Sequence, residues 1–291
     1  MKLFAPKYYR NFVCIADKCT HSCCVGWEID VDKNALNKYA TITHPYGEFI
    51  RSNIDNTDYP HFKLSENDRC PHLDDCGLCK IIKNVGEDYL CDICREHPRF
   101  YNFTNRGKEV GLGLSCEEAC RIILSSDDYD EFYILDEIEE EADICEFDAT
   151  LHRKNIYEIL KNDSLSFRDK IQWINDNYGI NFFDTEFKEI LESLEYLDNS
   201  HKELFLSCHH YEFNEMLNDK LTRLLAYFIY RHSSEATNSE DFCASLGLSI
   251  SLVALISSLS NENSIEDIAR IVSEEIEYSE DNTFAIKDLF Y

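Results

Sequence analysis

The sequence contains few residues that break helices. Among 291 residues there are five prolines and nine glycines, and both residue types are poor helix formers. Long stretches are therefore free to form helices, and a collagen-like or Pro/Gly-rich disordered chain is excluded. Methionine and tryptophan occur twice each, whereas there are 17 tyrosines and 18 phenylalanines. At 34.1 kDa with 44% hydrophobic residues, the chain can bury a core of its own.

Positive charge is also scarce. The chain has 28 Lys and Arg residues against 56 Asp and Glu residues, a net charge of −28. Nucleic-acid binding draws much of its affinity from Lys and Arg on phosphates, so nucleic acid is disfavoured as a partner. An acidic surface attracts a basic segment or a substrate lysine, and it also keeps a protein soluble. The charge is uneven, since residues 1–120 have 15 basic and 18 acidic residues and the remainder has 13 and 38.

The amino terminus lacks the uninterrupted apolar run of a signal peptide. A proline and several basic residues interrupt MKLFAPKYYRNFVC, so we expect a cytoplasmic protein. Residues 242–259 carry no charged side chain and reach the lower length limit of a membrane span. Five serines and a glycine dilute this segment, and no positive residue flanks it. A buried core helix, and no membrane partner, is therefore expected.

Cysteine is concentrated in the first part of the chain, whereas the excess negative charge lies in the second part. Eleven of the fourteen cysteines lie in the first 120 residues. We predict a mainly α protein in which a loop-rich cysteine-cluster N-terminal region is followed by an all-helical C-terminal region. The predicted boundaries are 1–124 for the cysteine-rich region, 125–150 for an acidic connecting segment and 151–291 for the helical region. The connecting segment, with twelve carboxylates in residues 125–148, reads as a linker or as an amphipathic segment with a solvated face.

Helical periodicity is clearest late in the chain. In residues 214–232, apolar side chains recur at the spacing of one helix face. They are Leu217, Leu221, Leu224, Leu225, Phe228 and Ile229. Ser264 and Asp267 resemble a capping box that opens another helix, and Ser166 and Asp169 form a similar pair. These signals predict a helical carboxy-terminal region.

The cysteines of the first region are best explained as metal ligands or core residues. Cytosolic thiols stay reduced, so a disulfide framework is disfavoured. The eleven are Cys14, Cys19, Cys23, Cys24, Cys70, Cys76, Cys79, Cys91, Cys94, Cys116 and Cys120. A C-x2-C spacing lets one turn aim two sulfurs at one metal. Neighbouring side chains diverge, so Cys23 and Cys24 either bind different metal atoms or one of them packs as a small apolar residue.

Spacing alone leaves the metal open. Zinc and iron–sulfur clusters both use thiolate-rich sites. Five histidines are available as mixed ligands, although each alone is more typical of a surface group. They are His21, His44, His61, His72 and His97.

The cysteine segments resemble a known family. The segments are CIADKCTHSCCVGWEID, RCPHL, GLCKI, LCDICREHPRFYNF and GLGLSCEEACRIIL. In order and spacing they are similar to the amino-terminal signature of the flagellin lysine-N-methylases, and to the wider group of C-x2-C-x2-C-C zinc- or iron-chelating proteins. The resemblance covers about the first 125 residues densely, and RLLAYFIYRH fits the family more loosely. The chain is shorter than expected for the family.

The resemblance implies methyl transfer from S-adenosylmethionine to lysine side chains of flagellin. It also implies a cysteine-ligated cluster, 4Fe-4S with zinc as the alternative. Carried over residue by residue, the resemblance nominates as ligands Cys14, Cys19, Cys23, Cys24, Cys70, Cys79 and Cys94, with Cys116 as a further candidate. Cys76, Cys91 and Cys120 lie outside the pattern. The preferred role of the cluster is structural, because the C-x3-C-C run does not fit the C-x3-C-x2-C of radical chemistry.

The residues themselves leave the catalytic group and the cofactor site open. The target amine must be neutral, so a carboxylate or tyrosine has to accept its proton or a desolvated pocket has to lower its pKa. Gly111-Leu112-Gly113 is a candidate cofactor loop, and the alternative is a tight turn before a helix over Glu117–Leu124. Two further classes stay open. One is a non-enzymatic cluster-bearing interaction module, and the other is a redox or metal-delivery protein.

Overall fold

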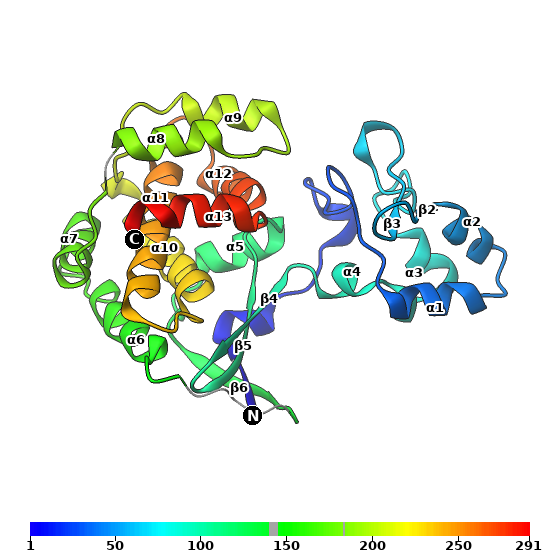
Figure 1. Cartoon of the computed structure of the whole chain (residues 1–291), viewed down its shortest axis with the longest axis horizontal. Helices are drawn as coiled ribbons and strands as arrows, with labels where there is room; N and C mark the ends of the chain where they lie inside the picture. Colours follow the sequence, from blue (N-terminus) through cyan, green and yellow to red (C-terminus); the bar gives the residue numbers. More distant parts are fainter. Residues whose placement is uncertain (140–144, 183) are drawn as a thin grey trace. The chain divides into compact units, whose positions relative to one another are not determined.

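The chain forms two compact units. The structure is a computed structural model that describes residues 1–139, 145–182 and 184–291. One unit, called the thiol unit here, is the continuous segment Val13–Pro98. The other, called the helical unit, combines Met1–Phe12 with Arg99–Tyr291 (Figure 1). Each unit has a hydrophobic core of its own. The boundaries predicted at residues 124 and 150 were drawn from composition, and they stay a prediction.

Short elements joined by turns make up the thiol unit. Its elements are η2 (Ala16–Lys18), α1 (Lys33–Thr41), α2 (Tyr46–Ser52), β2 (Ile54–Asp55), β3 (His61–Phe62), η3 (Glu66–Asp68), α3 (Lys80–Val85), η4 (Glu87–Tyr89) and α4 (Asp92–Glu96). Asp32 caps α1 by accepting a hydrogen bond from the Ala35 amide at 2.9 Å, which satisfies one of the free N–H groups of the first turn. The expectation of a loop-rich N-terminal region is therefore confirmed in part, since helices are interspersed with the loops.

A four-stranded sheet forms one layer of the helical unit. Its strands are β1 (Lys2–Pro6), β4 (Arg99–Thr104), β5 (Gly107–Leu112) and β6 (Phe132–Glu137), in the order β4-β5-β1-β6. Strand β1 runs parallel to β5, with Leu3 opposite Lys108, and antiparallel to β6. The expected fold class did not include this sheet. Strands β4 and β5 form a local hairpin, whereas β1 pairs with β5 and β6 across more than about a hundred residues. Local periodicity carries no signal of such long-range pairing.

Helices form the rest of the helical unit. They are η1 (Lys7–Asn11), α5 (Glu117–Ser125), α6 (Ala149–Leu160), α7 (Phe167–Tyr178), α8 (Asp184–Ser193), α9 (Asn199–Leu206), η5 (Glu215–Leu217), α10 (Asn218–Ser233), α11 (Ser239–Leu259), α12 (Ile265–Val272), the π-helical η6 (Ser273–Glu277), α13 (Glu280–Lys287) and η7 (Asp288–Phe290). Both predicted caps are present, since Ser166 and Asp169 form a capping box and Ser264 accepts from the Asp267 amide. Among the described residues beyond 150 the predicted all-helical region is confirmed.

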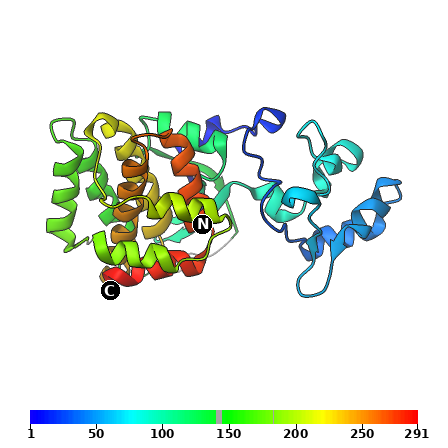
Figure 2. The ribbon, with the colours of Figure 1, turned by 90° about the horizontal axis from the view of Figure 1, so that it is seen from above.

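Helices α10 and α11 pack side by side in the centre of the helical unit (Figure 2). The green helices α6 and α7 contact α10. In the described residues, α11 is the one helix long and apolar enough to cross a membrane, and 89% of its apolar window is buried inside the protein. Hydroxyls within it bond to the preceding turn, Ser249 to the Ser245 carbonyl and Ser251 to the Gly247 carbonyl. The expectation of a buried core helix is confirmed.

The acidic connecting segment is only partly described. Strand β6 occupies Phe132–Glu137 within it, and Ile134 and Leu135 are exposed there. Residues 140–144, which carry three of its carboxylates, lie outside the described residues. The prediction of a linker for 125–150 therefore concerns residues that are described only in part, and part of the segment is a strand.

Candidate metal centre

The cysteines of the first region are divided between the two units. Nine lie in the thiol unit, whereas Cys116 and Cys120 lie at the start of α5 in the helical unit. Cys116 is the N-cap residue of α5, and Cys120 is buried with its thiol 3.5 Å from the Glu266 carbonyl oxygen. The thiol unit therefore holds every nominated ligand except the further candidate Cys116.

Five cysteines lie in or against the core of the thiol unit. Cys70 and Cys91 are buried, and Cys24, Cys79 and Cys94 are half-buried and pack against the same hydrophobic cluster. Different segments supply these cysteines, and local structure fixes each one. The Cys70 amide donates to the Cys24 carbonyl at 2.8 Å, which joins the two chain segments.

Helix starts position the other three thiols. Cys79 is the N-cap of α3 and Cys91 is the N-cap of α4. Cys94 lies one turn into α4, and its Sγ is 3.3 Å from the Sγ of Cys91. Both thiols of this C-x2-C pair are free. The C-x2-C spacing, which is typical of metal ligands, thus brings these two sulfurs into contact.

The thiols perturb one another electrostatically. A hydrogen bond from Cys23 lowers the pKa of Cys24 to about 7. Burial, together with the thiols of Cys24, Cys79 and Cys91, raises the pKa of Cys70 to about 12. The hydrogen bond between the Cys91 and Cys94 thiols lowers the pKa of Cys91. Since thiolates are the metal-binding form, the cluster contains both easily ionised thiols and thiols that need a cation to ionise.

Three nominated ligands lie outside this core. Cys14 and Cys23 are exposed, and Cys19 is half-buried with its thiol 3.1 Å from the His21 carbonyl oxygen. Within residues 13–98, no set of three or more His, Cys, Asp or Glu side chains has the geometry to hold one metal ion. The structure therefore brings together Cys24, Cys70, Cys79 and Cys94 of the nominated set and adds Cys91 to them. The identity of the ligands stays a prediction.

Two buried polar atoms near this core have no hydrogen-bond partner in the part of the chain that the structure describes, as expected if a metal or cluster binds beside them. The Tyr39 hydroxyl and the His72 Nε2 are buried without a hydrogen-bond partner among the described residues. The other ring nitrogen of His72 lies 2.7 Å from the Tyr46 hydroxyl, and burial lowers the His72 pKa to about 4. Of the five candidate histidines, His72 is the buried one. Soft thiolate donors with unsatisfied polar neighbours suit zinc or an iron–sulfur cluster.

The sequence is similar to three curated proteins. The chain is 32% identical to a flagellar biosynthetic protein FliU of Salmonella muenchen over 130 residues, which cover 42% of this chain and 77% of that protein. It is 30% identical over 132 residues to the lysine-N-methylases of Salmonella choleraesuis and Salmonella typhimurium. The chain belongs to the lysine-N-methylase family. The match covers 32% of the length of each of those two methylases.

Two further comparisons give no match. No known protein-family profile matches the chain, and no solved structure matches it.

The glycine motif of this family member lies where strand β5 ends. Gly111 and Leu112 close β5 and α5 begins at Glu117, so the predicted tight turn before a helix is present. Packing accounts for Gly111. A Cβ there would lie 2.3 Å from the Phe100 ring and 2.8 Å from the Tyr230 ring, closer than carbon atoms approach.

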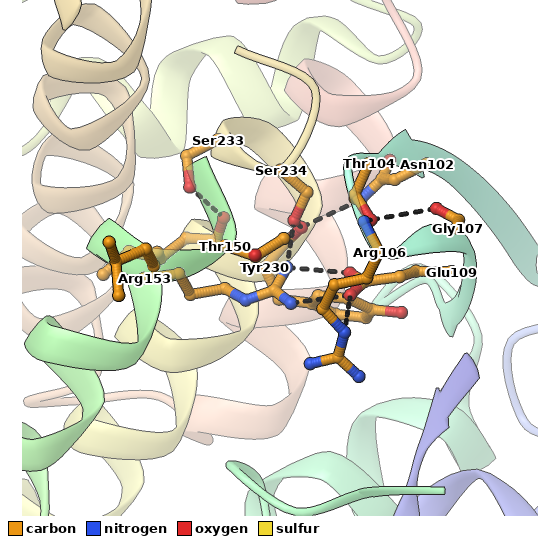
Figure 3. Close-up of polar contacts among 12 residues, drawn as sticks. Asn102, Thr104, Arg106, Gly107, Glu109, Thr150, Arg153, Tyr230, Ser233 and Ser234 are labelled. Atoms are coloured by element: carbon orange, nitrogen blue, oxygen red, sulfur yellow. Dashed lines mark hydrogen bonds and ion pairs between the residues drawn. The ribbon is translucent and has the colours of Figure 1, made fainter. Parts of the chain in front are cut away.

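A buried ion pair joins the sheet to the helices of the helical unit. Arg153 on α6 donates to both carboxylate oxygens of Glu109 on β5, each at 2.8 Å, and also to the Ser234 hydroxyl (Figure 3). The side-chain amide of Asn102 on β4 donates from Nδ2 to the Tyr230 carbonyl at 2.9 Å. Both charges of the pair have hydrogen-bond partners. The Arg153–Glu109 pair and the Asn102 bond therefore hold β4, β5, α6 and α10 together, which is a structural role.

A second buried carboxylate lies at the π-helical segment η6. Glu277 accepts from the Tyr227 hydroxyl at 3.0 Å, lies 2.8 Å from His232 Nε2 and pairs with Arg231 at 3.2 Å. Burial opposes its ionisation, but Arg231 and His232 outweigh burial and lower the pKa of Glu277. A carboxylate that is ionised and fully paired is a poor proton acceptor. The sequence signal for this cluster is weak, because only Tyr227, Arg231 and His232 lie close together along the chain.

Proposed function

We propose that this chain takes part in the S-adenosylmethionine-dependent N-methylation of lysine side chains on flagellin. The observation that carries the proposal is the match to 77% of a flagellar biosynthetic protein, together with the two lysine-N-methylases. The net charge of −28 supports it, because an acidic protein attracts lysine-bearing segments.

The chemistry sets clear demands on the protein. S-adenosylmethionine supplies the methyl group, and the attacking lysine must be neutral although its ordinary pKa is about 10.4. Loss of the proton requires a nearby acceptor or a desolvated pocket. Glu109 and Glu277 do not fit the acceptor role, because each carboxylate already forms a buried ion pair with an arginine. The proton acceptor is left unassigned.

We further propose that a 4Fe-4S cluster, with zinc as the alternative, organises the thiol unit. The ligands would come from the nominated Cys24, Cys70, Cys79 and Cys94, from Cys91 beside them, and from the preceding segment with Cys14, Cys19 and Cys23. Short elements and loops bury little apolar surface, and metal ligation supplies folding free energy to such units. The presence of five cysteines in or against one hydrophobic core supports this role.

The test is the intact mass of purified flagellin after anaerobic incubation with the metal-loaded protein and S-adenosylmethionine. Mass gains in steps of one methyl group are expected. Cys70→Ser should abolish them, whereas Cys243→Ser, which changes a half-buried thiol of the helical unit, should leave them. No mass gain from protein that retains its metal contradicts the enzymatic proposal.

The second candidate is a non-enzymatic cluster-bearing interaction or redox protein. It is favoured by the short match, which covers only 32% of each methylase. Calorimetric titration with S-adenosylmethionine separates the two candidates, since only the methyltransferase requires binding. Reversible reduction of a bound cluster without S-adenosylmethionine binding would favour the redox protein.

A further inference from the structure

Tyr39 lies in the core of the thiol unit with an unsatisfied hydroxyl. Its side chain is 1% exposed, on the buried face of α1. Asp32, which caps α1, also accepts a hydrogen bond from the Asp92 amide at 2.7 Å. This bond ties α1 to the start of α4, the helix that carries Cys94. No described residue is a hydrogen-bond partner of the Tyr39 hydroxyl.

The same core holds cysteines. Tyr39 belongs to the hydrophobic cluster that contains the buried Cys70 and Cys91, and three more cysteines of the thiol unit pack against this cluster. A tyrosine hydroxyl has an ordinary pKa of about 10, so it keeps its proton at neutral pH and is a hydrogen-bond donor. A buried donor without an acceptor is unfavourable, and native proteins rarely retain one without a reason.

Tyr46 provides a contrast within the same core. Its side chain packs against the same hydrophobic cluster. The Tyr46 hydroxyl already has a partner in His72 Nδ1 at 2.7 Å. Of these two tyrosine hydroxyls, one therefore has a hydrogen-bond partner in the protein and the other has none among the described residues.

We propose that Tyr39 is a positioning residue whose hydroxyl donates a hydrogen bond to a metal-bound cysteine sulfur of the thiol unit. The inference rests on the proposed metal site. Metal binding converts a thiol to a thiolate, which is a stronger acceptor, so the donor gains its partner when the metal binds. Donors around metal ligands orient them and strengthen metal binding.

The experiment compares Tyr39→Phe with Tyr46→Phe in the full chain, using zinc alone as the probe. Zinc affinity is measured by competition with a chromophoric chelator, and the stability of the metal-free protein is measured by thermal unfolding. Tyr39→Phe should weaken zinc binding roughly tenfold. Without metal it should unfold at the same or a higher temperature, because only an unsatisfied hydroxyl is removed.

The control variant should behave differently. Tyr46→Phe breaks the bond to His72 and should lower the unfolding temperature of the metal-free protein. A purely structural role of Tyr39 would lower the stability of its metal-free variant too, and that result overturns the proposal. Unchanged zinc affinity in Tyr39→Phe, or no zinc binding by the unmodified chain, also overturns it. None of these readouts uses methyl transfer, so failure here is distinguishable from failure of the flagellin assay.

Discussion

The guanidinium of Arg153 and the carboxylate of Glu109 form two parallel hydrogen bonds of 2.8 Å inside the helical unit. Their side chains are 3% and 0% exposed. The pair joins α6 to the central part of the sheet, where β5 lies between β4 and β1. Strand pairing and helix packing in this unit therefore depend on each other.

Loss of one partner of this pair should destabilise the helical unit. Glu109→Gln leaves the buried Arg153 charge without its carboxylate, which we expect to cost about 3–5 kcal/mol of unfolding free energy. Denaturant unfolding measures the loss. The pair of Lys161 and Asp130, whose side chains are 49% and 14% exposed, gives the less buried control, since Asp130→Asn should cost less than about 1 kcal/mol. Equal losses in the two variants would contradict the role assigned to burial.

The pair of His201 and Glu275 should make stability depend on pH. His201 Nδ1 lies 2.6 Å from the Glu275 carboxylate. This hydrogen bond raises the pKa of His201 above its ordinary 6.5, and Asp198 and Glu274 act in the same direction. The resulting stabilisation is complete below pH 6.5 and is lost as the pH rises through the raised pKa. The exposed part of the ring limits it to about 0.5 kcal/mol.

The measurement is the difference in unfolding free energy between the unmodified chain and His201→Gln at pH 6 and at pH 9. The difference should be larger at pH 6. A difference that is equal at both values, or larger at pH 9, would show that the protonated ring does not contribute.

Gly111→Ala tests whether the glycine motif serves packing or cofactor binding. The added Cβ would meet the rings of Phe100 and Tyr230, and overpacking of this kind costs about 1–3 kcal/mol. Phe100→Leu in the same chain should recover part of that loss. If packing is the role of Gly111, calorimetric affinity for S-adenosylmethionine stays unchanged in folded Gly111→Ala. A loss of affinity without a loss of stability would restore the cofactor-loop hypothesis.

The helices could be predicted from sequence because their signals are local. The apolar face of residues 214–232 and the caps at Ser166 and Ser264 are all read within one or two turns. The sheet could not be predicted, because Leu3 pairs with Lys108 and with Asp136, and these pairings depend on the folded helices around them. Composition groups residues 99–112 with the cysteines, yet β5 within this range pairs with the first strand of the chain and β4 pairs with β5.

The thiol core was only partly visible in the sequence. The C-x2-C spacing of Cys91 and Cys94 was a usable signal for Cys91, although the family pattern left that residue out. No sequence signal distinguished the buried Cys70 from the exposed Cys14, because both lie in irregular segments. Tyr39 gave no signal either, since one tyrosine among 17 on an apolar helix face is an ordinary core residue.

Metal loading should stabilise the thiol unit selectively. Since thiolate ligation contributes folding free energy only where the ligands lie, added zinc or a reconstituted cluster should slow amide hydrogen exchange in residues 13–98 and leave α10 and α11 unchanged. Excess chelator should reverse the effect. Cys70→Ser and Cys91→Ser should each remove it, because both thiols are buried in the shared core. Cys243→Ser in α11 is the matched control. Protection that rises equally in both units, or that survives both substitutions, would exclude these thiols as the metal ligands.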